Sequence, residues 1–428
     1  MQRNDLFAIK NVFFAKENPL FAFFFVLLRS NRRNFFLTMI KILLLTDFSS
    51  GYSRQLLQGV VEYSKQNGHW VFYRMPIYYR ELYGDTGVVE WAKKWKADAI
   101  LAQLSSVNTK ILNQLDIPII VQNYKDRYKN ISNLTGDYYN TGVMAARFFL
   151  EKGFKYFAYY GLTDTVWMRE RGEGFRDEVM KREKYFVAYE GPPSMEKEKW
   201  SFDAESVSQW LLQLPKPTAL FACDDYYALQ ITEVCKMYNI DVPNDISILG
   251  VDNDELLCNI SDPNLSSIEL DVLNGGFEAG KLLHSFILKK LKPPVDVIVK
   301  PIRIVERKST KKYAVNDKHI EKLLTYIETH YMYALSVEDL VKFVPFSRRV
   351  LEKKFKEETG VTIYNYILRL RIEKFSEILI TTDIPLIEAA SSVGFNDYKN
   401  ISRLFFKEKG ITPFQYRKLQ THHAHGFR

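Results

Sequence analysis

Charged side chains follow several apolar runs that are typical of buried β-strands. Asp224 and Asp225 come directly after the run at 219–222, and Asp252 follows the run at 246–251. Open parallel sheets bind ligands beyond the carboxyl ends of their strands. Carboxylates and an arginine at such positions form charge-assisted hydrogen bonds of about 1.5–3 kcal/mol each, which suits a ligand rich in hydroxyl groups. The sequence therefore indicates a site for a polyhydroxyl small molecule.

Other side chains in the same region fit this chemistry. Arg171 opens the stretch Arg171-Gly172-Glu173-Gly174-Phe175, and Asp137 begins an expected helix. Trp167 and Tyr52 could lie against the apolar face of a sugar ring. Each aspartate could instead be a helix cap or turn residue, and Arg171 could be an ordinary ion-pair partner. The candidate sugar-binding residues are Tyr52, Arg54, Asp137, Trp167, Arg171, Asp224, Asp225 and Asp252.

The chain ends in two patterns of a short helix, a turn and a second helix. The first pattern covers residues 336–360, and Ser347 can cap its second helix. The second pattern covers residues 384–410, with Gly394 at the sharp turn, and one long helix over 363–381 joins the two. Each unit is expected to place its second helix in a DNA major groove.

Polar residues on these second helices are the candidates for contacting DNA. Residues 310–428 hold 20 Lys/Arg and 14 Asp/Glu, whereas residues 39–309 hold 33 and 35, which favours a polyanionic partner for the C-terminal part. Arginine can read guanine edges, whereas phosphate contacts position a protein without reading sequence. Each side chain could also be a solvated helix charge. Base-edge contacts are expected from Arg348, Arg349, Glu352, Asn396, Asp397, Lys399 and Arg403, phosphate contacts from Lys353, Lys356, Lys407 and Arg417, and Ser347 completes the DNA-binding candidates.

The helical part resembles the DNA-binding domain of AraC-family transcription regulators. Gly394-Phe395-Asn396-Asp397, then Ser402-Arg403-Leu404-Phe405, then Gly410-Ile411-Thr412-Pro413 and finally Tyr416-Arg417 reproduce that family's terminal signature in order and spacing. The resemblance covers residues 318–418 and implies two recognition helices in successive major grooves. Three positions depart from the family pattern, namely Asn400, Phe406 and Phe375.

Short apolar runs alternate with amphipathic stretches from Met39 onward, as in parallel strands joined by crossover helices. This pattern predicts a doubly wound, two-lobed α/β architecture, followed by the all-α domain with tandem helix-turn-helix units. The chain is expected to change lobe near residues 123–137 and again near 252–265. Strands are expected at 40–46, 70–75, 99–103, 118–122, 156–161, 185–189, 219–222 and 246–251, and helices at 54–66, 142–152 and 226–238.

The α/β part resembles the effector domains of LacI-type repressors and periplasmic sugar-binding proteins. The R-x-x-G-F element at 171–175, the acidic pair at 224–225 and the G-x-D element at 250–252 match ligand contacts of that superfamily. Four further elements carry a closer likeness: Phe157–Gly161, Asp252–Leu256, Ala279–His284 and Pro301-x-Arg303-x-Val305-Glu306-Arg307-x-Ser309-Thr310. With them, both parts together resemble the xylose operon regulators, which join a LacI-like sensor to an AraC-like DNA reader. This resemblance covers residues 39–417 and implies D-xylose as effector, a homodimer, operator DNA and RNA polymerase as partners, and activation of pentose-catabolism genes.

The beginning of the chain needs a separate interpretation. The apolar run at 19–28 has half the length of a membrane helix, and the arginines after it do not fit a secretory signal. We expect translation to start at Met39 and residues 1–38 to be disordered or absent. The expected organisation is a sensor over 39–306, a linker over 307–317, a DNA-binding domain over 318–418 and a frayed tail over 419–428.

Several function classes are disfavoured. The sequence has no Walker P-loop, no GxGxxG after a strand and no metal-spaced His/Asp cluster, which argues against an enzyme, a cofactor and a metal. A periplasmic transport receptor would need an export signal and no DNA-binding domain. Cys223, Cys235 and Cys258 lack CxxC spacing, which fits a reducing cytoplasm away from the membrane. The same architecture sensing another pentose or a plant-polysaccharide sugar remains an open alternative.

Overall fold

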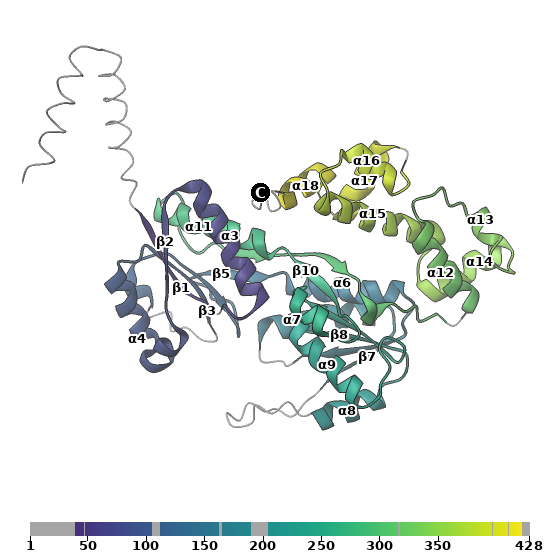
Figure 1. Ribbon diagram of the computed structural model, residues 1–428, viewed down its shortest axis with the longest axis horizontal. Helices are drawn as coiled ribbons and strands as arrows, with labels where there is room; N and C mark the ends of the chain where they lie inside the picture. Colours follow the sequence, from purple (N-terminus) through teal and green to yellow (C-terminus); the bar gives the residue numbers. More distant parts are fainter. Residues whose placement is uncertain are drawn as a thin grey trace, which may run out of the picture.

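The computed structural model describes residues 39–46, 48–104, 112–161, 165–189, 204–315, 317–395, 397–409 and 411–421. A two-lobed α/β sensor is followed by a helical domain that lies beside it (Figure 1). The expectations for residues 1–38 and for the tail beyond 421 fall outside the described residues.

The N-terminal lobe is built on a sheet of six parallel strands. Alternate residues of its first strand pack on opposite faces: Ile42 and Leu44 face helix α3 (Gly51–Asn67), and Leu43 faces α4 (Ile77–Trp95). Both faces are therefore covered, which explains the continuous apolar runs. In spatial order the strands are β11 (Val297–Val299), β5 (Ser132–Gly136), β4 (Ile119–Asn123), β3 (Ala99–Leu104), β1 (Ile40–Leu45) and β2 (Trp70–Arg74).

The C-terminal lobe repeats this plan with one antiparallel edge strand, β12 (Pro301–Val305), paired with β10 (Ser266–Leu270). The other strands are parallel and run in the order β9 (Ile246–Val251), β8 (Thr218–Ala222), β6 (Tyr156–Tyr160) and β7 (Tyr185–Ala188). The helices of this lobe are α6 (Tyr138–Glu151), α7 (Val166–Met180), α8 (Ala204–Gln213), α9 (Asp225–Met237) and α10 (Glu255–Ile260).

The chain crosses between the lobes three times, after β5, after β10 and after β11. The crossing segments are hydrogen-bonded to one another, because Asp137 N donates to Val299 O and Asp271 N donates to Lys300 O, each at 2.8 Å. The first crossing agrees with the predicted lobe change. The second prediction, near 252–265, was wrong because β10 still belongs to the C-terminal sheet, and the third crossing was missed.

Glycines bring one pair of helices into backbone contact in each lobe. A Cβ atom on Gly276 of α11 (Val272–Ile287) would lie 1.9 Å from the carbonyl oxygen of Leu56 in α3. In the other lobe, a Cβ on Gly142 of α6 would lie 2.0 Å from the carbonyl oxygen of Arg171 in α7. Only glycine allows helices to approach this closely, so the position of α7 is fixed by α6.

The helical domain contains two small apolar cores joined by one long helix, α15 (Ile363–Thr381), whose bounds agree with the predicted connecting helix. Ile363 and Ile367 belong to the first core, and Phe375 and Leu379 belong to the second. The first core also receives α12 (Lys318–His330), α13 (Val337–Val341) and α14 (Arg348–Thr359), and the second receives α16 (Leu386–Ser392), α17 (Tyr398–Lys409) and α18 (Pro413–Thr421).

The segment between β12 and α12 is attached to the C-terminal lobe. Ser309 is fully buried, and its hydroxyl donates to Ile248 O at 2.7 Å and accepts from Ser266 N at 2.8 Å. The Thr310 and Ser266 hydroxyls lie 2.7 Å apart. The start of the expected linker is therefore held on the sensor.

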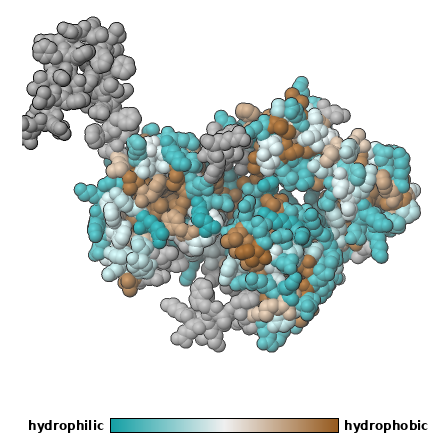
Figure 2. All heavy atoms as spheres, viewed as in Figure 1, coloured by the Kyte–Doolittle hydropathy of each residue, from teal (hydrophilic) through white to brown (hydrophobic). Residues whose placement is uncertain are grey.

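Hydrophilic residues cover much of the face shown in Figure 2, with apolar patches between them. Among the described residues, no helix combines the length and the apolar character needed to cross a membrane.

Replacing Gly276 by alanine should destabilise the N-terminal lobe. The new Cβ would overlap the Leu56 carbonyl oxygen, and overpacking of this kind costs about 1–3 kcal/mol of unfolding free energy. Urea unfolding followed by circular dichroism measures the loss. The control, Lys281→Ala, changes an exposed residue of the same helix and should stay within about 0.5 kcal/mol of the parent. Equal stability of the two variants would contradict the close helix contact.

Candidate functional site

Arg171 lies at the centre of the polar groups between the lobes. Its side chain is 3% exposed, although it carries a full positive charge. Nη1 donates to the carbonyl oxygen of Cys223 at 2.5 Å, Nη2 lies 3.5 Å from Oδ1 of Asp252, and the guanidinium stands over the ring of Tyr138 at 5.5 Å. Its Nε, which is also buried, makes no hydrogen bond with any described residue. The arginine is thus held firmly and keeps one donor for a ligand.

Two predicted aspartates adjoin this arginine. Burial raises the pKa of Asp252 to about 7, although Arg171 opposes the shift. Burial also raises the pKa of Asp224, which caps α9 by accepting from Tyr227 N at 2.9 Å. Burial alone would lower the pKa of Arg171, but Asp252, Tyr138 and Asp224 raise it on balance. The arginine therefore stays charged, whereas Asp252 can change its charge near neutral pH.

Asp225 has a structural role that the sequence did not reveal. Its side chain is fully buried, and Oδ2 accepts from Asp254 N at 2.8 Å. A Cβ on Gly250 would come within 2.2 Å of its Oδ1. The carboxyl group thus joins α9 to the turn after β9 through Oδ2. Its Oδ1 is buried and has no hydrogen-bond partner among the described residues, so Asp225 stays a predicted sugar contact.

The N-terminal lobe contributes a row of polar side chains that the sequence analysis missed. Thr46 directly follows β1, and Gln103 and Gln122 are the next-to-last residues of the adjacent strands β3 and β4. The strand register places the three side by side. Nε2 of Gln103 donates to Oε1 of Gln122 at 2.8 Å. Oε1 of Gln103 and the Thr46 hydroxyl are buried and have no hydrogen-bond partner among the described residues. The sequence signal that could have identified these residues is a single polar residue at the end of each apolar run.

Tyr52 connects the two lobes electrostatically. It lies in the first turn of α3, and its hydroxyl is buried without a hydrogen bond to the residues that the structure describes. Burial raises its pKa, as do Tyr138 and Asp252 of the other lobe. The lobes also meet beside it, because a Cβ on Gly51 would lie 2.4 Å from Oδ2 of Asp254. We call Thr46, Tyr52, Gln103, Gln122, Arg171, Asp224 and Asp252 the inter-lobe polar cluster.

The remaining predicted sugar-binding residues lie around this cluster. Arg54 is exposed and donates to the carbonyl oxygens of Phe48, at 3.1 Å, and Ser49 in its own loop. Trp167 packs edge-on against Tyr124, with ring centroids 5.1 Å apart. These contacts give Arg54 and Trp167 local roles, so neither is placed among the cluster residues.

Asp137 lies at the first lobe crossing. Its carboxylate accepts from Asn140 Nδ2 at 3.0 Å, and it lines a cavity of about 430 Å³. The cavity adjoins the polar cluster through Tyr138, whose ring faces Arg127 at 5.6 Å as well as Arg171. Asp137 therefore belongs to the wall of a cavity next to the cluster.

The first helix-turn-helix unit presents the predicted polar residues on α14. Ser347 is the N-cap residue, but the predicted cap is only partly right because its side chain makes no capping hydrogen bond. Arg348 pairs with Glu338 and, at 3.1 Å, with Glu352. Arg349 is exposed in the first turn of α14. Two further cations are exposed along the same helix, Lys353, which pairs with Glu357 at 3.7 Å, and Lys356 in the last turn.

The predicted DNA-binding residues of the second unit differ in how they are placed. Asn396 lies outside the described residues, and Asp397 accepts from Lys399 N at 2.9 Å at the start of α17. Lys399 and Arg403 are exposed, and Lys407 lines a second cavity between α15 and α17. Arg417 instead turns toward the protein, where Nη1 donates to Ile384 O at 2.6 Å and burial lowers its pKa.

Arg371, which the sequence analysis did not single out, fixes the two units relative to each other. From the middle of α15, its guanidinium donates to Tyr331 O at 2.8 Å and Tyr333 O at 2.7 Å. It also stands over the ring of Phe395 in the turn of the second unit, at 5.7 Å. Arg371, which is half-buried, therefore links the segment after α12 to the turn of the second unit.

Comparisons with known proteins agree with this arrangement. A periplasmic binding protein-like domain matches residues 146–310, and a helix-turn-helix domain matches residues 340–419. The xylose operon regulatory protein of Escherichia coli K12 is 29% identical over 390 residues, which cover 89% of this chain and 97% of that protein. The protein of the same name from Haemophilus influenzae is 28% identical over 387 residues, covering 88% and 98%.

A solved structure extends the likeness to three dimensions. The structure of the xylose-binding transcription activator xylR has 28% sequence identity and a TM-score of 0.56, and the match covers 90% of this chain and 99% of that chain. The fold and the site thus define a transcription regulator in which a periplasmic-binding-protein-like sensor is joined to an AraC-type DNA-binding domain. Over nearly its whole length, the chain is similar to the xylose operon regulatory proteins.

Proposed function

We propose that this protein is a transcription regulator that binds D-xylose between the two lobes of its sensor and operator DNA with α14 and α17. The observation that carries the sugar proposal is the convergence of buried polar atoms without partners, from Thr46, Tyr52 and Gln103 in one lobe and Arg171 in the other. A buried polar group without a partner costs about 1–3 kcal/mol, and sugar hydroxyls would relieve that cost. The whole-length similarity to xylose regulators supports D-xylose as the sugar.

In this proposal, each residue of the cluster makes a different hydrogen bond to the sugar. Arg171 Nε donates to a ring or hydroxyl oxygen, and the Asp252 carboxylate accepts from a hydroxyl group. Gln103 Oε1 accepts from a second hydroxyl on the opposite side. Because these atoms belong to different lobes, the sugar favours the arrangement in which the lobes are close. It can shift that equilibrium only by its differential affinity for the two states.

The DNA reader acts on paired sites in this proposal. The protein forms a homodimer, each chain contributes α14 and α17, and the bound activator contacts RNA polymerase. The same architecture responding to another pentose or to a sugar derived from plant polysaccharides is the second candidate. The observation that favours this second candidate is that the cluster offers hydrogen bonds that several pentoses can satisfy.

D-xylose should raise the thermal unfolding temperature of the full chain, because a ligand that binds only the folded state stabilises it by mass action. L-arabinose, D-ribose and D-glucose serve as competitors in the same assay. Arg171→Ala should abolish the D-xylose shift, whereas Arg176→Ala, an exposed change on the same helix, should retain it. A larger shift with another sugar would move the proposal to that sugar, and no shift with any of them would refute it.

The affinity for D-xylose should fall as the pH is lowered from 8 to 6. Asp252 has a pKa of about 7 without sugar, and a hydroxyl donor favours its ionised form, so binding must displace a proton at low pH. Arg171, Asp224 and Asp254 are the charged groups that act on it. The expected loss is about tenfold over this range, measured by titration calorimetry. Asp252→Asn should give a weaker but flat profile, and a flat profile for the parent protein would exclude this role.

Arg349→Ala should weaken binding to duplexes that the protein selects from a random-sequence pool in the presence of D-xylose. If Arg349 reads a base edge, the loss is about 1–3 kcal/mol and the preference at one base pair relaxes. Lys353→Ala should lower the affinity for selected and random duplexes by the same factor, and it should reduce the salt dependence of binding. Fluorescence anisotropy at several salt concentrations separates the two patterns. An equal loss on both duplexes for Arg349→Ala would make it a phosphate contact.

A further inference from the structure

Helix α6 runs from the inter-lobe polar cluster to the helical domain. It begins with Tyr138, whose ring lies under Arg171, and ends at Glu151. Its 14 residues span about 21 Å. Because Gly142 packs against the carbonyl oxygen of Arg171, α6 cannot move independently of the helix that carries this arginine.

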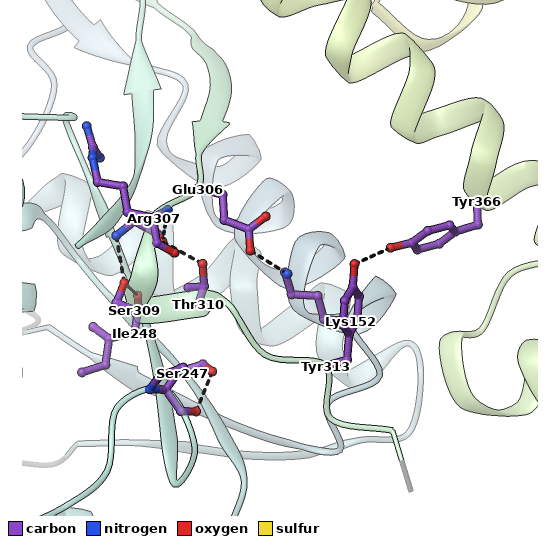
Figure 3. A network of polar contacts seen from close by, with 11 residues as sticks. Lys152, Ser247, Ile248, Glu306, Arg307, Ser309, Thr310, Tyr313 and Tyr366 are labelled. Atoms are coloured by element: carbon purple, nitrogen blue, oxygen red, sulfur yellow. Dashed lines mark hydrogen bonds and ion pairs between the residues drawn. The ribbon is translucent and has the colours of Figure 1, made fainter. Parts of the chain in front are cut away.

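The far end of α6 carries a buried cation. The Lys152 side chain is 7% exposed, and its Nζ lies 2.7 Å from Oε1 of Glu306. The ammonium group also stands over the rings of Phe148, at 5.1 Å, and Tyr313, at 4.7 Å. Figure 3 shows Lys152 between Glu306 and Tyr313. Such a desolvated cation holds its partners in fixed places.

Two polar contacts continue from this end to α15 of the helical domain. The hydroxyls of Tyr313 and Tyr366 lie 3.0 Å apart (Figure 3). One turn further along α15, Arg369 forms an ion pair with Glu151. Burial raises the pKa of Glu151, and Arg369 opposes that shift.

The backbone of the same corner is closely packed against the first helix-turn-helix unit. Ala314 N donates to Lys152 O at 2.8 Å. A Cβ on Gly153 would lie 3.0 Å from the carbonyl oxygen of Glu358 in α14. Gly153 has a φ of +84°, a conformation that favours glycine. The end of α6 therefore touches the helix that reads DNA as well as the helix that joins the two units.

We propose that the C-terminal end of α6 is the contact through which sugar in the sensor controls the placement of the DNA-binding domain. Glu151 and Lys152 are positioning residues: they hold α15 through Arg369 and through the Tyr313–Tyr366 pair. Because α15 belongs to both apolar cores of the helical domain, a displacement of α6 moves both recognition helices together. The proposal rests on the proposed sugar response and identifies the route by which it reaches DNA.

The test is a set of variants at the Glu151–Arg369 pair, namely Glu151→Ala, Arg369→Ala and the charge-exchanged double variant Glu151→Arg/Arg369→Glu. Each is measured for affinity to a selected duplex with and without D-xylose and, separately, for D-xylose affinity without DNA. In the parent protein, D-xylose is expected to change the affinity for the selected duplex by about 5–150-fold, and this factor is the allosteric coupling. Each single variant should reduce it to about twofold or less, while D-xylose affinity changes less than about twofold. The exchanged pair should recover part of the coupling.

Two further variants keep the result interpretable. Tyr366→Phe removes only the hydroxyl that meets Tyr313 and should lower the coupling while the protein remains folded by circular dichroism. Lys374→Ala changes a residue of α15 that pairs with Glu377 on the same helix and should leave the coupling at the parent value.

The outcomes separate the two proposals. Parent-like coupling in both single variants and in Tyr366→Phe would overturn the role of α6. A loss of D-xylose affinity equal to the loss of coupling would also overturn it, because the contact would then act on the sensor itself. If D-xylose does not change the DNA affinity of the parent protein, the proposed function itself is refuted.

Discussion

The arrangement of the sensor depends on the burial of one positive charge. The guanidinium of Arg171 is almost completely removed from solvent, and an unpaired charge in that position would be strongly destabilising. Its partners are a backbone carbonyl at the end of β8, the Asp252 carboxylate after β9 and the Tyr138 ring at the start of α6. Four elements must therefore meet at one point, and the glycine contact between α6 and α7 makes that meeting possible. The partly satisfied arginine is at once a structural requirement and the best donor for a ligand.

Charged contacts also position the helical domain. Half-buried Arg371 joins the two helix-turn-helix units. The Glu151–Arg369 ion pair joins the sensor to the helical domain, next to the buried pair of Lys152 and Glu306. In both places an apolar contact would hold the surfaces but would leave their register loosely defined. Charged hydrogen bonds of fixed geometry define that register, because a small displacement leaves a buried group without its partner.

The sequence predicted those parts of the molecule whose signal is local. Helix α15 and both helix-turn-helix units follow from apolar spacing and turn residues. Asp224 and Asp252 were singled out because they follow strands, and Arg171, which lies within α7, because it opens the R-x-x-G-F element. Strands β5, β10, β11 and β12 escaped because they are short or carry polar residues such as Asn133, Ser267 and Arg303, which mask the apolar pattern. Asp224 and Asp225 could not be told apart either. Adjacent positions at a helix start point in different directions, and only the packing of Asp254 against Asp225 distinguishes them.

The triple crossing also governs the order in which the sensor can be completed during synthesis. The N-terminal lobe needs α11 to cover α3 and β11 to finish its sheet, yet β11 begins at Val297, about 160 residues after β5 ends at Gly136. At cellular translation rates this gap lasts roughly 8–30 s. The open edge of β5 remains uncovered throughout that interval, and the face of α3 that packs on α11 remains uncovered until α11 has been made. A nascent chain of this protein is thus exposed to chaperones and to wrong pairing for longer than a lobe built from contiguous sequence would be.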